Sequence, residues 1–245
     1  MQDIGVKNFT MLSFSMKKCC IIPDVNVIID QFCTGKYVRD ARSRELIEYC
    51  LENDRLVTYD ALLRAAYNVA KDLRMRGELS KEGHRDVKDF MKRARPRRID
   101  MGMLAEMDDI ATVIEQMYRE RGFTDECNDL LRAVALVPER YRGIARDTYS
   151  SQMDEDKKEK LHDGLAVPDM GDLRLLGFAV LMKREYDKVI VVSNDADIIG
   201  WEENLDIVKK IESKFGITTG TPSDILDRLR VANAQAGAPT STAHI

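Results

Sequence analysis

Two aspartates follow a short apolar run in the last quarter of the chain. Residues Val189 to Val192 read Val-Ile-Val-Val, a continuous β-branched run that is typical of a strand buried on both faces of a parallel sheet. Asp195 and Asp197 stand just beyond the carboxyl end of this run. Ligands bind at that edge of open α/β sheets, so the two carboxylates indicate a site. A polar turn that caps the next helix would give the same pattern.

An aspartate also ends an apolar segment near residue 20. The apolar run from residue 19 predicts a short strand that ends at Asp24, and Asn26 lies close behind it, before an apolar helix. A third acidic position, Asp172, falls in the first turn of a predicted helix, where the helix dipole favours a carboxylate. Helix capping explains either Asp169 or Asp172, but less readily both.

Asp24, Asp172 and Asp195 come from three separated segments, each at the carboxyl end of a strand or the amino end of a helix. In a parallel sheet those ends lie on one edge, so we expect the three carboxylates to converge. Like charges a few ångströms apart raise one another's pKa, a cost that a bound cation offsets. Mg2+ or Mn2+ suits an all-oxygen site and can activate water beside a phosphodiester. The pattern predicts metal-dependent phosphodiester hydrolysis.

Strand and helix signals alternate in both halves of the chain. This alternation predicts an α/β fold of three layers, α/β/α, around a mainly parallel central sheet. The predicted strands cover residues 19–24, 55–59, 189–192 and 217–219, and the main predicted helices cover 43–53, 60–75, 80–93, 103–121, 172–186, 201–215 and 225–231.

Helical periodicity without strand signals predicts a helical insertion at about 95–165, packed on the edge of the sheet and including helices at 125–137 and 139–149. The predicted organisation is an N-terminal extension at 1–18, an α/β domain at 19–232 that contains the insertion, and a disordered tail at 233–245.

The composition bounds the function further. With 245 residues, net charge -4 and 44% hydrophobic residues, the chain has the composition of a soluble globular protein. No apolar run approaches the roughly 20 residues of a membrane helix and no signal peptide is evident, so we expect a cytoplasmic protein without a membrane partner. The cysteines lack paired C-x-x-C spacing and the histidines form no cluster, so any metal site must be made of oxygen.

Four segments, in this order, resemble the PIN-domain nucleases. Pro23 to Ile29 is similar to the opening motif of that family, with its first metal-binding aspartate and neighbouring asparagine. Asp172 to Ala179 resembles the central acidic helix motif, and Val191 to Asp197 the late motif in which Thr or Ser precedes Asp-x-Asp. Ile217 to Leu229 resembles the closing strand and Thr-Pro helix. The resemblance covers roughly residues 19–75 and 167–230.

The resemblance implies a PIN-like ribonuclease that depends on Mg2+ or Mn2+ and acts on RNA. Asn26 and Ser193 would orient the carboxylates through hydrogen bonds. Since dimerisation is common among PIN domains, a homodimer is also implied, and the helical insertion could take a protein partner. The residues assigned to the metal are Asp24, Asp172, Asp195, Asp197 and Asp169, with the first three as the catalytic carboxylates.

The chain departs from the family in the helix after the second strand, where PIN nucleases usually carry a glutamate. Ala65 or Arg64 falls at that position, and Asp60 at the helix start is the candidate replacement. The departure motivates a second hypothesis, a catalytically weak PIN-like domain that acts as an RNA-binding or assembly module. A third hypothesis is a phosphotransfer or haloacid-type hydrolase on a similar sheet. Such enzymes generally require an Asp-x-Asp at the first strand, and the asparagine at position 26 breaks this pattern.

Basic residues gather between Lys71 and Arg98, although the chain is acidic overall. A local cationic cluster near a carboxylate site is what a nuclease needs to hold a polyanion. A solvated helix end and linker would explain the same run. The residues predicted to bind nucleic acid are Arg64, Lys92, Arg93, Arg95, Arg97 and Arg98.

Overall fold

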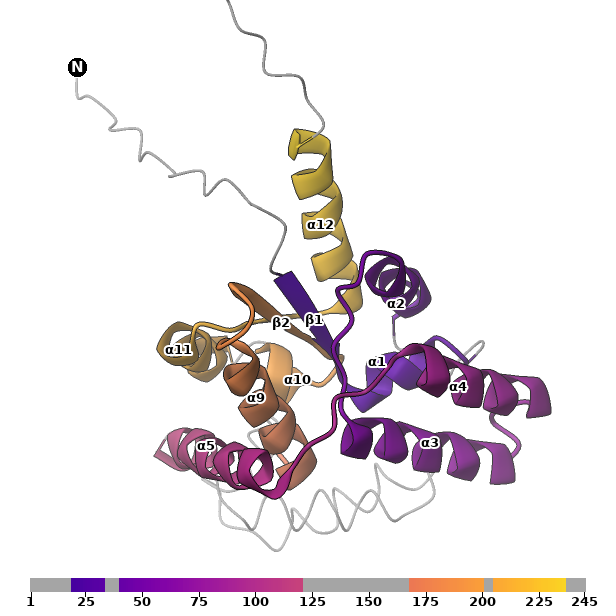
Figure 1. Ribbon diagram of the computed structural model, residues 1–245, viewed down its shortest axis with the longest axis horizontal. Coiled ribbons are helices and arrows are strands. Elements are labelled where there is room, and N and C mark those ends of the chain that lie inside the picture. Colours follow the sequence, from indigo (N-terminus) through magenta and orange to yellow (C-terminus); the bar gives the residue numbers. More distant parts are fainter. Residues whose placement is uncertain (1–18, 34–39, 121–167, 201–204, 237–245) are drawn as a thin grey trace, which may run out of the picture.

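The computed structural model describes residues 19–33, 40–120, 168–200 and 205–236. Its centre is a small parallel sheet with the lateral order β1-β2-β3 (Figure 1). β1 pairs with β2 along its whole length, and β2 pairs with β3 through its last three residues. The predicted α/β fold class with a parallel sheet is therefore confirmed. The strands are β1 (Cys19–Pro23), β2 (Lys188–Val192) and β3 (Thr218–Gly220).

Two isolated backbone pairings extend this sheet beyond β1. Ile21 exchanges backbone hydrogen bonds of 2.8 and 3.0 Å with residues 55–57. On the far side of the same segment, the Arg97 N–H donates to the Thr58 carbonyl at 2.8 Å. The strand predicted at 55–59 is thus reduced to single bridges, and Arg97 adds a neighbour that the sequence pattern did not predict.

In this parallel sheet the chain adds neighbours first on one side of β1 and then on the other, so the lateral order of its strands reverses between β1 and β2. From β1 the chain moves outward to residues 55–59 and then to Arg97, and it returns on the other side of β1 as β2 and β3. In open α/β sheets such a switch point, at the carboxyl ends of the two strands, is where ligands bind.

Helices lie on both sides of the strands. Figure 1 shows α9 and α11 on one side and α2 and α12 on the other, an arrangement compatible with three layers. None of the described helices is long and apolar enough to cross a membrane. The helices of these residues are α1 (Val25–Asp30), α2 (Ser43–Glu52), α3 (Asp60–Met75), α4 (Lys81–Arg93), α5 (Met101–Glu120), α9 (Met170–Met182), α10 (Ala196–Ile199), α11 (Leu205–Phe215) and α12 (Pro222–Ala236).

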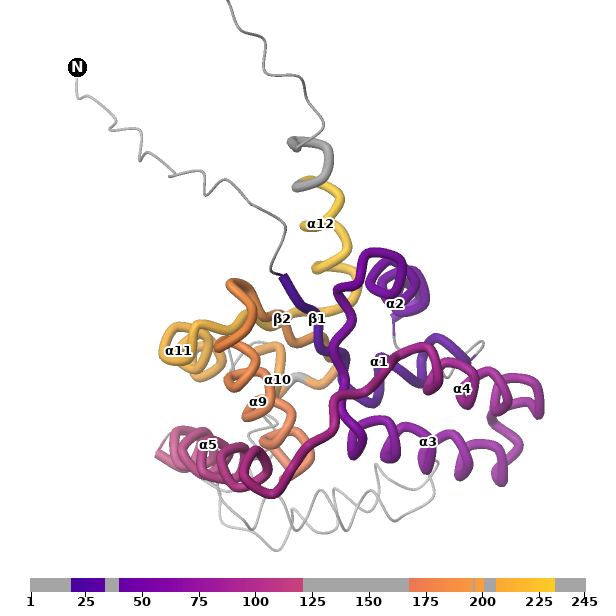
Figure 2. The backbone as a smooth tube through the Cα atoms, in the orientation of Figure 1, coloured from indigo at the N-terminus to yellow at the C-terminus, as the bar shows by residue number. Residues whose placement is uncertain are grey.

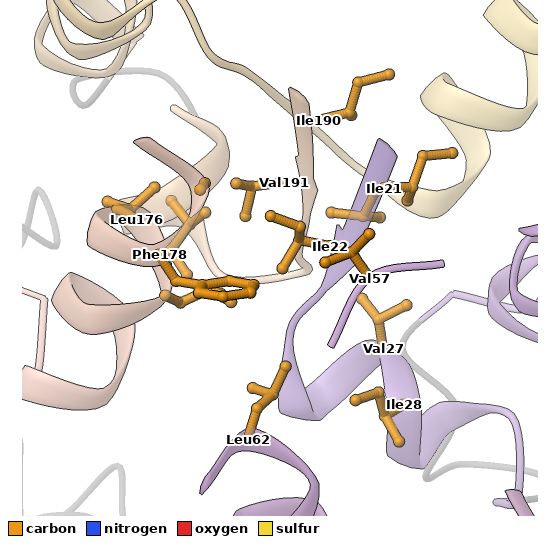
Figure 3. Packing of buried hydrophobic residues seen from close by; sticks show 14 of the residues in the cluster. Ile21, Ile22, Val27, Ile28, Val57, Leu62, Leu176, Phe178, Ile190 and Val191 are labelled. Atoms are coloured by element: carbon orange, nitrogen blue, oxygen red, sulfur yellow. The ribbon is translucent and has the colours of Figure 1, made fainter. Parts of the chain in front are cut away.

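The strands are buried on both faces, as their β-branched sequences predict. Ile22 and Val191 point toward Phe178 of α9, whereas Ile21 and Ile190 point to the opposite face (Figure 3). Each of these five side chains is at most 3% exposed. Because successive strand residues face opposite sides, both helical layers are packed against the same short strands.

Side-chain caps fix where helices begin. The Thr221 hydroxyl accepts from the Asp224 N–H at 3.1 Å, and Pro222 is the first residue of α12, as predicted. α12 then continues to Ala236. The prediction of a disordered tail from residue 233 is therefore wrong for its first four residues.

The helix in the described part of the predicted insertion, α5, has its main contact with α9 (Figure 2), whereas Arg97, before this helix, pairs with Thr58 at the sheet edge. The Arg174 guanidinium of α9 binds both oxygens of the Asp108 carboxylate of α5, at 2.6 and 3.1 Å. A Cβ atom at Gly177 would lie 2.7 Å from the Met107 carbonyl oxygen, so this glycine sets the distance between the two helices. The helices predicted at 125–149 lie outside the described residues.

Gly177→Ala is expected to lower the free energy of unfolding by roughly 1–3 kcal/mol, because the new methyl group would force α5 and α9 apart. Chemical denaturation measures the change. Gly102→Ala, in the first turn of α5, is the control, since its nearest neighbour is an Asp100 side-chain oxygen at 3.3 Å that can move. Equal stability of the two variants would contradict the close helix contact.

Candidate metal centre

Three carboxylates meet at the switch point of the sheet. Asp24 follows β1, Asp195 follows β2, and Asp172 lies in the first turn of α9. One oxygen from each of them lies within 4.8 Å of the others. Asp24 is buried and the other two are partly buried. The predicted convergence of these three residues is confirmed.

Asn26 and Ser193 lie between two of the carboxylates. The Asp24 Oδ2 atom accepts from the Asn26 amide at 2.7 Å and from the Ser193 hydroxyl at 2.8 Å. The same amide donates to Asp195 Oδ2 at 2.8 Å, and the Asp195 N–H donates to Ser193 Oγ at 3.0 Å. These donors place partial positive charge beside Asp24 and Asp195, and they fix the orientation of both carboxylates.

Asp172 lacks this support. Within the described part of the chain, no group donates a hydrogen bond to its side chain. Burial is the largest cause that raises the pKa of Asp172 to about 8, and the negative charges of Asp169, Asp24, Asp195 and Asp197 add to it. Much of the repulsion in the cluster therefore falls on Asp172, where either a proton or a cation can relieve it.

Asp169 and Asp197 lie beside the cluster but supply no oxygen to it. Asp169 is the exposed N-cap of α9, and its Oδ1 atom accepts from the N–H groups of Gly171 at 2.6 Å and of Asp172 at 3.0 Å. Asp197 lies in the first turn of the short helix α10. Capping therefore accounts for Asp169, and Asp172 is the carboxylate that joins the cluster.

A second layer of hydrogen bonds, which the sequence pattern did not predict, holds the loop before Asp195. The Asn194 N–H donates to Asn26 Oδ1 at 3.2 Å, and its side-chain amide donates to Asp30 Oδ2 at 2.9 Å. Asp30 is buried, and the same oxygen accepts from the Asp40 N–H at 3.1 Å. The signal in the sequence is the i, i+4 spacing that puts residues 26 and 30 on one face of α1.

Two buried tyrosines also reach the centre. The Tyr118 hydroxyl, from the last turn of α5, donates to the backbone carbonyl of Asp197. The Tyr59 ring packs against Phe178 with centroids 4.6 Å apart, and burial, followed by the charge of Asp24, raises the pKa of its phenol. Helical spacing could have predicted the burial of Tyr118, but not its contact with a segment 79 residues away.

α3 supplies no carboxylate to the cluster. Asp60, the suggested replacement for the missing glutamate, lies in the first turn of α3 but outside the three-carboxylate group. Ala65 and Arg64, at the expected position, are both exposed. The centre is therefore built from residues after β1, after β2 and at the start of α9.

The predicted basic cluster is partly neutralised. Arg97 binds both oxygens of Glu185 at 2.6 Å, and Lys92 binds Asp89 at 2.9 Å. These two residues are therefore already engaged with carboxylates. The exposed side chains with no ion pair to a described residue are Arg64, Arg93, Arg95 and Arg98.

Chemically, the cluster fits a hard divalent cation such as Mg2+ or Mn2+, which prefers oxygen ligands. With bonds of about 2.1 Å, the ligands of one Mg2+ ion lie within about 4 Å of one another, close to the 4.8 Å limit observed here. Among the described residues, no histidine or cysteine joins the group. The three carboxylates could therefore hold one metal ion. Comparisons of this chain with family models, curated proteins and solved structures found no match.

Asp172→Asn is expected to stabilise the metal-free protein, by an amount that grows between about pH 4 and pH 8. In this window folded Asp172 keeps a proton that the unfolded chain has released, so rising pH favours unfolding of the wild type. Thermal unfolding in EDTA across this window measures the difference, with the exposed Asp187→Asn as control. Parallel pH profiles of wild type and Asp172→Asn would contradict the raised pKa.

Asp30→Ala is expected to weaken Mn2+ binding about 10-fold, because Asp30 holds Asn194 and through it the loop that carries the ligand Asp195. Asp40→Ala is the matched control, since the Asp40 carboxylate binds Ser223 and not the loop at 193–195. Titration calorimetry with Mn2+ measures both affinities. The same affinity for both variants would show that Asp30 does not position Asp195.

Proposed function

We propose that the chain is a PIN-like ribonuclease that depends on Mg2+ or Mn2+ and hydrolyses phosphodiester bonds of RNA. The observation that carries the proposal is the convergence of Asp24, Asp172 and Asp195 at the switch point of a parallel sheet. The hydrogen bonds of Asn26 and Ser193 to these carboxylates support it further, because the family resemblance gives both residues that role.

When bound, the cation would lower the pKa of a coordinated water and neutralise charge on the phosphodiester. Asp24 and Asp195 would be presented to it in fixed orientations by Asn26 and Ser193. Asp172 would release its proton on metal binding, since its neutral form is favoured only while the neighbouring charges are uncompensated. The chain's own contribution is thus a rigid pair of carboxylates and a third that exchanges a proton for the cation.

RNA as the substrate follows from the resemblance, and exposed cations at the edge of the sheet support it. Arg93, Arg95 and Arg98 are exposed on the segment that crosses the edge of the sheet. Their positive charges could hold a phosphate backbone, and a contact of this kind carries no base sequence information.

A second candidate function is an RNA-binding or assembly module with weak or no catalysis. The specific observation in its favour is that α3, where PIN nucleases usually carry a glutamate, supplies no carboxylate to the cluster. Such a module would bind RNA without metal-dependent cleavage.

Asp24→Asn and Asp195→Asn are each expected to reduce RNA cleavage by more than about 100-fold, because both remove a charged metal ligand. The assay uses a labelled pool of single-stranded and structured RNA with Mn2+, Mg2+ or EDTA. Asp187→Asn makes the same chemical change at an exposed position outside the cluster and should cleave like the wild type.

Three results separate the two functions. Cleavage that requires the metal and is lost in both cluster variants supports the nuclease. If the wild type binds RNA but cleaves it no faster than the two variants do, the nuclease is rejected in favour of the binding module. If the wild type still cleaves RNA in EDTA and both variants cleave it equally well, the carboxylate centre is rejected as the source of cleavage.

A further inference from the structure

We infer that the adjoining faces of α3 and α4 bind the backbone of single-stranded RNA and lead it toward the carboxylate cluster. We call this region the α3–α4 surface. The choice of RNA rests on the proposed function, whereas the polyanion-binding character rests on the residues themselves. The surface comprises Arg64, Tyr67, Lys71 and Arg74 of α3 together with Lys81, His84 and Lys88 of α4.

Helical spacing places the cations of α3 on one flank. Arg64, Lys71 and Arg74 are separated by seven and three residues, so they lie on the same side of the helix as Tyr67. Asp72 lies about 100° or more around the helix from Lys71 and Arg74. Asp60, four residues before Arg64, is on the same side, so this flank of α3 carries three cations and one carboxylate.

The charges of α4 are separated in the same way. Lys81, His84 and Lys88 follow the i, i+3, i+7 spacing of a single helix face. The acidic residues occupy the other exposed side, where Glu82 pairs with Arg85 and Asp89 with Lys92. The face of α4 that lies beside α3 therefore carries Lys81 and Lys88 without an acidic residue of the same helix on this face.

An aromatic pair joins the two flanks and fixes two of the cations. The rings of Tyr67 and His84 lie 5.3 Å apart, which shows that the two faces are in contact. The Lys88 ammonium lies 5.7 Å from the centre of the Tyr67 ring, and Arg74 Nη1 lies 3.3 Å from His84 Nδ1. Preorganised cations lose less side-chain entropy when they bind a ligand.

Positive charge on this surface is not compensated locally. Arg64, Lys71, Arg74 and Lys88 are exposed, and none of them forms an ion pair with another described residue. Burial, and then the charges of Arg74, Lys88 and Lys71, lower the pKa of His84. A chain of phosphates is the ligand that would relieve such mutual repulsion along a line of cations.

The surface starts at the candidate metal centre. Asp24 is the N-cap of α1, and α1 packs against α3. From there α3 runs outward with α4 beside it (Figure 1), over about 24 Å for 16 residues at 1.5 Å each. A strand bound along α3 would therefore enter the cluster from the end at Arg64.

The test is RNA binding by a triple variant, Lys71→Ala, Arg74→Ala and Lys88→Ala, measured by fluorescence anisotropy. The probe is a labelled 20-nucleotide oligouridine in EDTA over a range of KCl concentrations. The variant is expected to bind at least 10-fold more weakly than the wild type. The slope of the logarithm of the binding constant against the logarithm of the KCl concentration should become smaller by about 2, since each of three phosphate contacts on a single strand contributes about 0.7.

The matched control is Lys209→Ala, Lys210→Ala and Lys214→Ala on α11, which removes the same charge from exposed positions elsewhere. It should change the affinity less than twofold. Because Arg74 contacts a buried histidine, the double variant Lys71→Gln and Lys88→Gln keeps that contact and should still lose affinity.

Equal affinities of the α3–α4 and α11 variants for the RNA probe would overturn the inference. It would also be overturned if the wild-type protein bound the RNA probe no more tightly than it bound poly-glutamate, because the ligand would then be an acidic protein. If the wild type binds RNA through this surface but does not cleave it, only the proposed nuclease function is rejected. If the wild type cleaves RNA but the triple variant binds it with unchanged affinity, only the proposed binding surface is rejected.

Discussion

Repulsion among three carboxylates is the constraint around which the described part of the molecule is arranged. The order in which the chain adds its parallel strands reverses between β1 and β2, and this switch point places Asp24 and Asp195 side by side. Asn26 donates to both carboxylates, and Ser193 donates to Asp24 and accepts from the Asp195 N–H, so these two carboxylates are held in a fixed geometry. Asp172 arrives from a helix without such donors, and burial together with the neighbouring negative charges raises its pKa. The fold thus contains a rigid acidic pair and a third group whose charge depends on what is bound.

The two parts of the centre are supported by different regions of the chain. Behind Asp195, Asn194 connects the loop to Asp30 and through it to the residues before α2. Asp172 depends instead on the packing of α9 against α5, which Gly177 makes close and which the Arg174 pair with α5 holds in place. α5 also reaches α10 through a tyrosine hydroxyl. The helix expected to begin a peripheral insertion is therefore part of the support of the centre.

Local sequence was sufficient for most helices and for the three converging aspartates, since strand ends and N-caps are encoded within a few residues. The weak strand at 55–59 failed as a prediction because strand formation depends on pairing partners, and here only single bridges form on each side. The pairs Arg97 with Glu185 and Tyr118 with Asp197 join residues 88 and 79 positions apart, which no local pattern encodes. At the C-terminus, the alanines after Val231 favour helix, and helix propensity outweighed the composition that had indicated disorder.

The three-carboxylate cluster has one further consequence, which concerns net charge. When Asp24, Asp172 and Asp195 are all ionised, a single divalent cation leaves the centre with one negative charge. A phosphodiester is also an anion, so the centre by itself offers no long-range attraction to a polynucleotide. Attraction must come from cations outside the centre, and over such distances it is screened by salt with a Debye length of about 8 Å at physiological ionic strength. Capture and bond cleavage would then respond differently to ionic strength, because they depend on fields from different parts of the molecule.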